Sequence, residues 1–584
     1  MSKFARFLTL GVALVMLMSL GFSSAAAQLR DVPRERTVIF DVDGKEVRNP
    51  ELFNPLVVGV TLNAGHHQAM WEPLFILNYE TGEIMPWLGE SFTPNDTLDV
   101  WTLKLREGIK WADGEAFDAD DVVYSIQVRL DNAPELRDSP QMDQWVESVE
   151  KVDDLTVVFN LKDPNPRFQL DYFSVRIWGS VIIVPEHIFR DQDPLTFTFY
   201  DPEKGWPFGT GPYLPVGVSE TEFIWDRNDD YWGVDVFGLP APERLIWRVG
   251  ATEEIRVAAA ANDELDSLTD ITLGAYEALK RQNPNWIAWL DELPYVWLDP
   301  CPREWLFNTT VEPWDDPDMR WAINYAIDRD EIVAVAYEGS TIPSRSMFVE
   351  YGAMQPYIDA LFEAGLYDEF PMLEYNPDKT VEILESKGYV KNGDYWEKDG
   401  EVLGVLIETH EGFIEKRRIA QVLVEQLQRV GIDAQTRTLA GGTWNDNRDF
   451  GDFEVQMAWD SCGSVNEPWN TMDYFNVSWL VDIGERAARN RGRWSGEAAE
   501  AYSAIVDQIG VLPLGDPQIK ELVVDAMRIW MAELPAIEIT QARKLVPFNT
   551  TYWTNWPTAE NNYNHPANWW MSVHQMLHEI QPAQ

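Results

Sequence analysis

The stretch WTLKLREGIKWADGEAFDADDVVYS, residues 101–125, decides the fold of this 584-residue chain. Apolar and polar residues alternate from Trp101 to Leu105, which is the period of a half-buried strand. Asp113-Gly114 then indicates a turn. Asp118 is a good N-cap for a helix, whose apolar positions are Val122, Ile126 and Leu130. The stretch therefore predicts a strand, a turn and a helix in succession.

Other segments show the same two periods. Residues 155–161 alternate like a strand. Residues 419–430 have helical spacing, Gly431 ends that helix, and residues 432–438 alternate as the next strand. Another helix is predicted over 321–332. The order helix, glycine, strand is typical of α/β folds with mixed or parallel sheets, so the fold class is predicted to be α/β.

The composition is that of a folded but strongly acidic protein. Hydrophobic residues make up 45% and charged residues 24%, which predicts a sizeable core and not wholesale disorder. Asp and Glu number 96 against 46 Lys and Arg, a formal net charge of −50. Such a surface repels phosphate backbones, so nucleic acid is excluded as a partner.

The N-terminus has the pattern of a secretory signal peptide. Lys3 and Arg6 precede an apolar run over residues 7–22, and small residues ending at Ala27 form a cleavage site. We expect residues 1–27 to be removed. The first cysteine is Cys301, so none lies near the cleavage site for lipid attachment. The chain is therefore expected to be exported, to the periplasm or beyond the cell.

The two cysteines, Cys301 and Cys462, allow one disulfide. It closes a loop of roughly 160 residues and contributes up to ~5 kcal/mol on the chain-entropy model. Two separate buried thiols are the alternative, because a sequence does not fix proximity.

Three segments together resemble family 5 of the solute-binding proteins of ABC importers, which includes dipeptide, oligopeptide, nickel and oligosaccharide receptors. The first contains Trp71-Glu72-Pro73-Leu74-Phe75, Pro86-Trp87-Leu88 and the 101–125 stretch. The second contains Phe307-Asn308-Thr309, Arg320 and the run from Ala322 to Arg329. The third is the helix that ends at Gly431-Ile432-Asp433. The resemblance covers nearly the whole chain after the leader.

The resemblance implies a two-lobed, periplasmic-binding-protein-like fold of type II. Lobe I is expected over 28–300, with an extra subdomain at about 76–203, and lobe II over 301–540; 541–584 return to lobe I. Linkers near residues 299–302 and 537–546 suit paired crossings between the lobes. The family also implies a disulfide between Cys301 and Cys462 and a monomer that delivers its solute to ABC permease subunits. No catalytic residue, cofactor or metal is expected, and the protein is not an enzyme.

The C-terminal tail favours an oligosaccharide as the solute. Its Trp553-x-x-Trp556-Pro557, Glu560-Asn561 and Tyr563 are similar to the tails of oligosaccharide receptors, although Asn562 and His565 depart from their pattern. Aromatic planes cover the C–H faces of sugars, and amides and carboxylates bind their hydroxyls. The candidate ligand-binding residues are Trp71, Asn308, Glu411, Trp444, Trp459, Asp460, Trp469 and Asn470.

Two other functions remain open at this point. Peptide receptors of the family place an aspartate after the cleft tryptophan, and Asp460 lies closer to Trp459 than that role requires. A secreted glycoside hydrolase needs two carboxylates beside the scissile bond, and sequence spacing does not exclude such a pair.

His574 and His578 have helical i, i+4 spacing, but two ligands are too few for a metal site.

Overall fold

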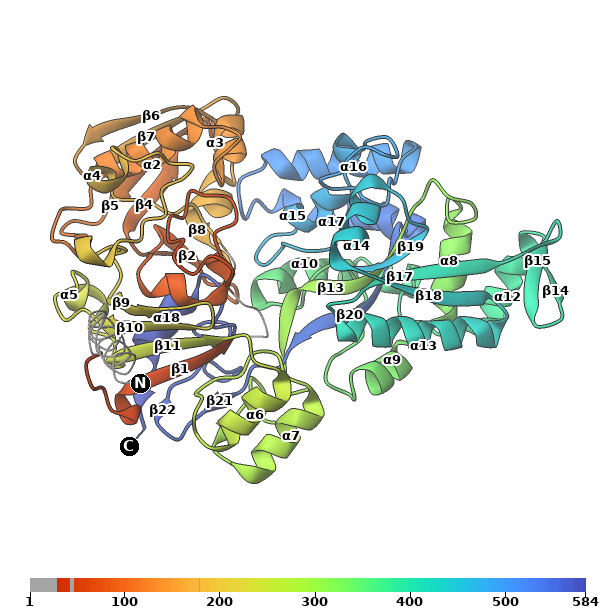
Figure 1. Cartoon of the computed structure of the whole chain (residues 1–584). Helices are drawn as coiled ribbons and strands as arrows, with labels where there is room; N and C mark the ends of the chain where they lie inside the picture. Colours follow the sequence, from red (N-terminus) through yellow and green to blue (C-terminus); the bar gives the residue numbers. More distant parts are fainter. Residues whose placement is uncertain (1–28, 43–46, 178, 584) are drawn as a thin grey trace, which may run out of the picture.

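The computed structural model describes residues 29–42, 47–177 and 179–583, and the expected signal peptide lies outside these residues. Two large hydrophobic clusters divide the described chain. One joins residues from Val38 to Trp297 with residues from Val546 to Ile580, and it also contains Val349, Tyr351 and Val465. The other joins residues from Trp305 to Ile539. We call the bodies around these clusters the first lobe and the second lobe, and they lie side by side in Figure 1.

The second lobe is built on a five-stranded mixed sheet in the order β18-β17-β19-β13-β20. The strands are β18 (Asp433–Leu439), β17 (Gly404–His410), β19 (Val455–Ala458), β13 (Trp297–Phe307) and β20 (Ala536–Lys544). Helix α13 (Ile414–Val430) packs on it through Ile419, Leu423 and Leu427, which are fully buried. Gly431 ends this helix in the left-handed region, at φ 94°, as its position after the apolar run predicted.

Strands β13 and β20 run from one lobe to the other (Figure 1). They pair antiparallel from Trp297 opposite Lys544 to Leu306 opposite Ala536. The pairing has irregularities between Asp299 and Glu304. Two strands far apart in sequence therefore form a joint connection between the two bodies.

The first lobe contains two four-stranded sheets. One has the order β1 (Thr37–Val42), β11 (Arg244–Val249), β10 (Glu222–Arg227) and β9 (Tyr213–Val218). The other is antiparallel, with β4 (Gly89–Pro94), β5 (Val100–Leu105), β7 (Thr156–Leu161) and β6 (Val146–Asp153). The C-terminal segment returns to this lobe, where β21 (Phe548–Asn549) pairs with β12 (Trp286–Ile287).

The stretch 101–125 folds as its sequence predicts. Strand β5 buries Trp101, Leu103 and Leu105, and the turn at Gly114 has φ 97°. Helix α2 (Ala119–Asp131) begins with a full capping box between Asp118 and Asp121. These residues support the fold of the first lobe.

The sequence predicted a single helix over 321–332, and this prediction is wrong. The chain forms α8 (Pro317–Ala326) and then α9 (Arg329–Ala336), with a break at Ile327-Asp328. The side chain of Asp328 accepts a hydrogen bond from the backbone N–H of Glu331 and so starts a new helix. An aspartate in the middle of an apolar helical pattern acted here as an N-cap.

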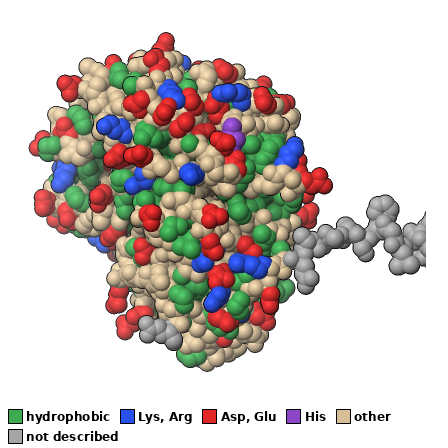
Figure 2. Space-filling view, turned by 90° about the vertical axis from the view of Figure 1, so that its left-hand side faces the viewer, with side chains coloured by type: hydrophobic (Ala, Val, Ile, Leu, Met, Phe, Trp, Pro, Cys, Tyr) green, Lys and Arg blue, Asp and Glu red, His purple; other side chains and the backbone are tan. Residues whose placement is uncertain are grey.

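Helices cover the second lobe on the side of α16 (Glu497–Val511) and α17 (Gln518–Glu533), which pack against each other. The short α15 (Trp469–Met472) and α14 (Gly441–Phe450) lie near them in Figure 1. On the face in Figure 2, carboxylates are spread over the whole surface and do not gather in one patch. The acidic side chains on that face are therefore dispersed and do not mark one site.

Candidate functional site

A pocket of about 410 Å³ lies where the two lobes meet beside the crossing strands. Its wall contains four aromatic side chains. Trp289 precedes the crossing strand β13 and Trp297 begins it. Tyr79 follows β2 (Phe75–Leu77), and Tyr351 comes from the segment before α10 (Gln355–Glu363) and packs into the first-lobe cluster. Among the described residues that line it there is no Lys, Arg or His, whereas Glu80 and Glu350 are present. The pocket thus has aromatic walls and a negative rim.

The aromatic side chains of this pocket are held in fixed positions. Trp297 stacks on Tyr351 with ring centroids 5.9 Å apart, and the edge of Tyr79 meets Tyr351 at 4.9 Å. The Tyr79 hydroxyl donates to the side-chain oxygen of Asn562 at 2.6 Å. The Tyr351 hydroxyl donates to the carbonyl of Leu298 at 2.6 Å. Burial raises the pKa of both phenols, so each stays a hydrogen-bond donor.

A second aromatic cluster surrounds Trp459, just after β19. Trp459 is partly exposed and stacks on the buried Trp444 with centroids 5.0 Å apart. Nζ of Lys416 lies 2.9 Å from the Trp459 ring centroid and has no hydrogen-bond partner. Burial lowers the pKa of this amine well below its ordinary value. Lys416 therefore supports the rear of the Trp459 ring by packing.

Asp460 is already neutralised within the second lobe. Its Oδ1 accepts from Nη1 of Arg448 at 3.1 Å and from Nη1 of Arg491 at 3.0 Å. The side chain is almost fully buried. An ammonium group that approached Asp460 would meet two guanidinium groups first, so this carboxylate is poorly placed to hold a cation.

Behind Asp460, two buried carboxyl groups share one hydroxyl. Glu304 and Glu538 lie opposite each other on β13 and β20, and Oγ of Ser461 contacts both. A hydroxyl has one proton to donate, so one of the two carboxyls must itself be protonated. In agreement, burial and the charge of Asp460 raise the pKa of Glu304 to about 7. Cys301 and Cys462 form a disulfide beside this cluster.

The lobes also touch through a buried ion pair. Arg167 of the first lobe donates from Nε and Nη2 to Oε2 of Glu467 in the second lobe, both at 3.1 Å. Its other nitrogen donates to the carbonyl of Gly510 at 2.7 Å, at the C-terminal end of α16. The guanidinium lies 5.0 Å from the ring centroid of Trp469. This contact joins the two lobes at a place other than the crossing strands.

The structure brings four of the eight sequence-predicted site residues into one neighbourhood of the second lobe. Trp444, Trp459 and Asp460 adjoin Arg448, which lies 4.9 Å from the Trp444 ring. Glu411 is exposed at the nearby end of β17. Trp469 and Asn470 lie at the interlobe ion pair, where Asn470 Oδ1 accepts from Arg489 at 3.0 Å.

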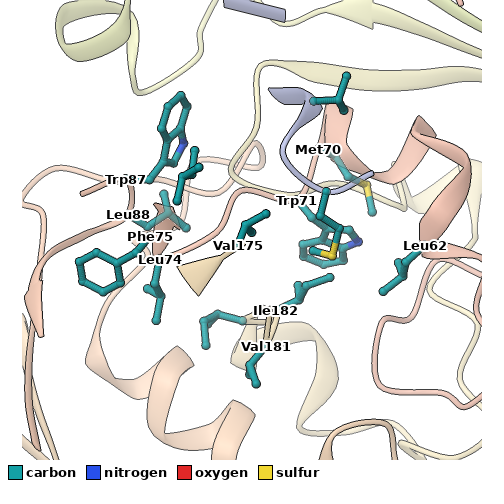
Figure 3. Close-up of a cluster of buried hydrophobic side chains, with 14 of the residues drawn as sticks. Leu62, Met70, Trp71, Leu74, Phe75, Trp87, Leu88, Val175, Val181 and Ile182 are labelled. Carbon is teal, nitrogen blue, oxygen red and sulfur yellow. The ribbon is translucent and has the colours of Figure 1, made fainter. Parts of the chain in front are cut away.

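The other two predicted residues have structural surroundings. Trp71 is 2% exposed and lies in the first-lobe core (Figure 3), against Trp111 and Phe199. Asn308 is buried and donates to the carbonyls of Gly451 and Phe453. We therefore leave Trp71 and Asn308 out of the proposed site.

Sequence reasoning missed the interlobe pocket and the ion pair. Trp297 lies just before the linker predicted over 299–302, and Asn562 was a departure from the tail pattern, so two weak signals existed. Tyr79, Tyr351 and Arg167 carried no local signal, because only the tertiary structure places them between the lobes.

No group of three His, Cys, Asp or Glu side chains in the described part of the chain is arranged to hold a metal ion. In α18 (Val573–Glu579) His574 is buried and His578 is half-buried, and removal from water lowers their pKa values to about 3 and about 4. Within the described ranges, none of the helices has the length and apolar character needed to cross a membrane. A larger cavity of about 710 Å³ lies on the second lobe alone, with mainly charged walls.

Comparison with known proteins adds family and fold. Residues 83–479 match the model for the middle region of bacterial extracellular solute-binding proteins, family 5. The glutathione-binding protein GsiB of Shigella flexneri serotype 5b is 28% identical over 392 residues, which are 67% of this chain and 68% of that protein.

Solved structures show the same fold. A periplasmic oligopeptide-binding protein of an oligopeptide ABC transporter from Thermotoga maritima has a TM-score of 0.80 at 22% identity, covering 94% of this chain and 100% of that one. A mannohexaose-bound structure of an oligopeptide-binding protein from the same organism has a TM-score of 0.73 at 22% identity, covering 94% and 99%.

Proposed function

Since this chain belongs to family 5 of the bacterial extracellular solute-binding proteins, we propose that the solute it captures is an oligosaccharide. As a family member the chain is the extracytoplasmic, solute-binding subunit of an ABC importer and not an enzyme. It delivers its solute to permease subunits in the membrane. The fold is the α/β, two-lobed fold of these receptors. The class of solute is the proposed step.

The observation that carries the proposal is the composition of the interlobe pocket. Its four aromatic side chains, Tyr79, Trp289, Trp297 and Tyr351, come from segments far apart in the sequence, and Trp289 is the most exposed of them at 9%. Sugar rings present apolar C–H faces that aromatic planes cover. Without a cationic side chain among its described lining residues, and with Glu80 and Glu350 at its edge, the pocket repels the carboxylate of a peptide.

The pocket has the right size and place for capture by closure. A volume of about 410 Å³ falls in the range of roughly 300–1,000 Å³ for small-molecule sites. Tyr351 lies on the chain between the two crossing strands and Trp289 lies before them, so a solute that contacts both is bound better when these two parts of the chain are together. A neighbour with the same fold carries mannohexaose, which agrees with this class of solute.

A peptide or glutathione is the alternative solute, since GsiB binds glutathione. In this chain the aspartate after the cleft tryptophan is engaged by Arg448 and Arg491. Both arginines bind Oδ1, so a peptide amino terminus would meet the remaining Oδ2 beside two guanidinium groups, which repel its positive charge. The hydroxyl groups of a neutral sugar impose no such cost.

The test is isothermal titration of the exported chain with manno- and cello-oligosaccharides, glutathione and a mixed pool of short peptides. We expect one oligosaccharide class to bind at one-to-one stoichiometry and to be recovered unchanged. Binding of glutathione or peptides without any response to sugars would overturn the oligosaccharide proposal.

A further inference from the structure

A second cavity, of about 320 Å³, lies wholly within the first lobe. Arg137 and Asp138 reach it from the turn between α2 and α3 (Ser139–Trp145). Asp171 belongs to the π-helical turn η4 (Gln169–Phe173). Arg176 and Ser180 follow β8 (Ser174–Val175). Three separate segments thus place polar side chains around one small cavity.

The polar groups in this wall are poorly satisfied by each other. Nη2 of Arg176 is 3.4 Å from Oδ1 of Asp171, and Nε of Arg137 is 3.8 Å from Oδ1 of Asp138. Both distances exceed those of good N–H···O hydrogen bonds, about 2.7–3.2 Å. Buried atoms without a hydrogen-bond partner are Nη1 of Arg137, Oδ2 of Asp138, Oδ1 of Asp171, Nη1 of Arg176 and Oγ of Ser180.

Such a concentration of unpaired groups is unusual, because about 90% or more of buried polar groups in proteins have a partner. Ser180 is 6% exposed, so its hydroxyl is shielded from bulk water. Its neighbours in the wall include two donors and two acceptors that are likewise unpaired. The wall therefore matches a ligand that both donates and accepts hydrogen bonds.

The charges of the wall select against ions. The two arginines and two aspartates among its described lining residues have formal charges that cancel. A phosphate or carboxylate would be attracted by the guanidinium groups but repelled by Asp138 and Asp171, and an ammonium group would face the opposite conflict. A neutral hydroxyl group satisfies both kinds of partner. Val60, Leu62 and Val181 add an apolar side to the cavity.

The cavity is close to the place where the lobes meet. Glu467 and Arg489 of the second lobe are electrostatic neighbours of Asp171. Arg167, four residues before Asp171, makes the ion pair with Glu467. A ligand group held here is thus positioned beside the interlobe contact, and the small volume admits a short unit only.

We propose that this cavity is a separate subsite that takes one hydroxyl-bearing sugar unit of the solute, through Arg137, Asp138, Asp171, Arg176 and Ser180. The proposal rests on the oligosaccharide function proposed above. It adds that the first lobe binds part of the sugar by itself, through direct hydrogen bonds.

Ser180→Ala is the most informative variant, because the hydroxyl it removes has no hydrogen-bond partner among the residues that the structure describes. The folded protein loses no internal hydrogen bond, so its unfolding temperature should stay the same or rise. Affinity for the sugar should fall about three- to tenfold, the range for one hydrogen bond. The control is Ser148→Ala, at a half-buried serine of β6 (Val146–Asp153) that does not line the cavity; it should bind like the unchanged protein.

Titration of both variants with mannohexaose, with glycine as a zwitterion and with inorganic phosphate as an anion decides the matter. Weaker mannohexaose binding by Ser180→Ala alone supports the subsite. Equal mannohexaose binding by all three proteins overturns the subsite but leaves the proposed function intact. An effect confined to glycine or phosphate also overturns it. Failure of the unchanged protein to bind any oligosaccharide overturns the proposed function and the subsite with it.

A second variant tests the charge argument. Asp138→Asn keeps the shape of the side chain and suits the left-handed backbone of this residue, whose φ is 63°. It leaves the wall with one net positive charge. We expect phosphate binding to increase at least threefold and sugar binding to weaken. Unchanged binding of both probes would contradict the assignment of Asp138 to the subsite.

Discussion

Arg167 and Glu467 form an ion pair that is buried between the two lobes, with side chains 2% and 3% exposed. Both partners are also bound elsewhere. Arg167 donates to the carbonyl of Gly510, and Glu467 accepts from the backbone N–H of Trp469. The pair therefore belongs to a satisfied network and connects the extra sheet of the first lobe to the end of α16. Its integrity bears directly on how the lobes come together.

Glu467→Gln should weaken the contact between the lobes. The change leaves the Arg167 guanidinium buried without its counter-charge, which costs about 3–5 kcal/mol for a buried pair. Lobe separation lets water reach the guanidinium, so we expect small-angle scattering to show a larger radius of gyration and solute affinity to fall by at least tenfold. Asp143→Asn, which removes an exposed partner of Lys162, is the control. A radius equal to that of the unchanged protein would argue against a role in closure.

Replacement of both Cys301 and Cys462 by serine should lower stability but leave the solute site. The disulfide joins residues 161 positions apart. Loss of such a crosslink costs up to about 5 kcal/mol on the chain-entropy model. We expect a lower unfolding temperature in calorimetry, with solute affinity within about twofold once the protein is folded. A large loss of affinity at temperatures well below unfolding would show that the bridge shapes the site directly.

Glu304→Gln should change how stability depends on pH. The pKa of Glu304 is raised from 4.5 to about 7 in the folded protein, so the unfolded chain loses this proton first as pH rises. The contribution of Glu304 to folding is therefore unaffected below about pH 4.5 and becomes progressively unfavourable up to about pH 7. We expect the variant to gain unfolding temperature relative to the unchanged protein across this interval.

The same measurement has an internal check. Glu538, Asp460 and Ser461 surround Glu304, and Glu538 is the other carboxyl that contacts Ser461. Glu538→Gln should produce a similar pH-dependent gain, since either substitution removes one of the two competing charges. A pH-independent difference between Glu304→Gln and the unchanged protein would mean that Glu304 does not titrate in this interval.

Trp289→Ala should reduce oligosaccharide affinity with little effect on the fold. Trp289 is 9% exposed and lines the interlobe pocket. Loss of one aromatic plane in contact with a sugar should weaken binding by about ten- to a hundredfold, on the scale of roughly 1.5–3 kcal/mol for a buried large apolar side chain. Trp479→Phe, at an exposed tryptophan of the second lobe, is the control. If Trp289→Ala and the control bind the oligosaccharide with equal affinity, the sugar does not bind against Trp289 and the site lies elsewhere.

Local patterns in the sequence predicted much of the fold. The Asp118 capping box, the alternation in β5 and the glycine after α13 each act within a few residues, and each appears in the structure. The wrong prediction of one helix over 321–332 also has a local cause. The apolar pattern continues through Asp328, but the side chain of Asp328 caps a new helix and so ends the first one. The link between Cys301 and Cys462, by contrast, came from the family resemblance and is present.

The interlobe pocket could not be predicted from local sequence patterns. The sequence predicted both Trp71 and Trp459 as ligand-binding residues. In the structure Trp71 lies in the core, whereas Trp459 is partly exposed at the surface. Tyr79 and Tyr351 meet across 272 residues, and Arg167 and Glu467 meet across 300. These contacts depend on the tertiary structure, in which the crossing strands place one lobe against the other.

The most direct test of capture between the lobes is a crystal structure of the exported chain grown with mannohexaose or with the oligosaccharide that binds best in titration. The account predicts an intact oligosaccharide with at least one ring against Trp289, Trp297 or Tyr351, contacted from both lobes. A sugar bound only at an outer surface, or a peptide occupying the pocket in the presence of the sugar, would contradict it.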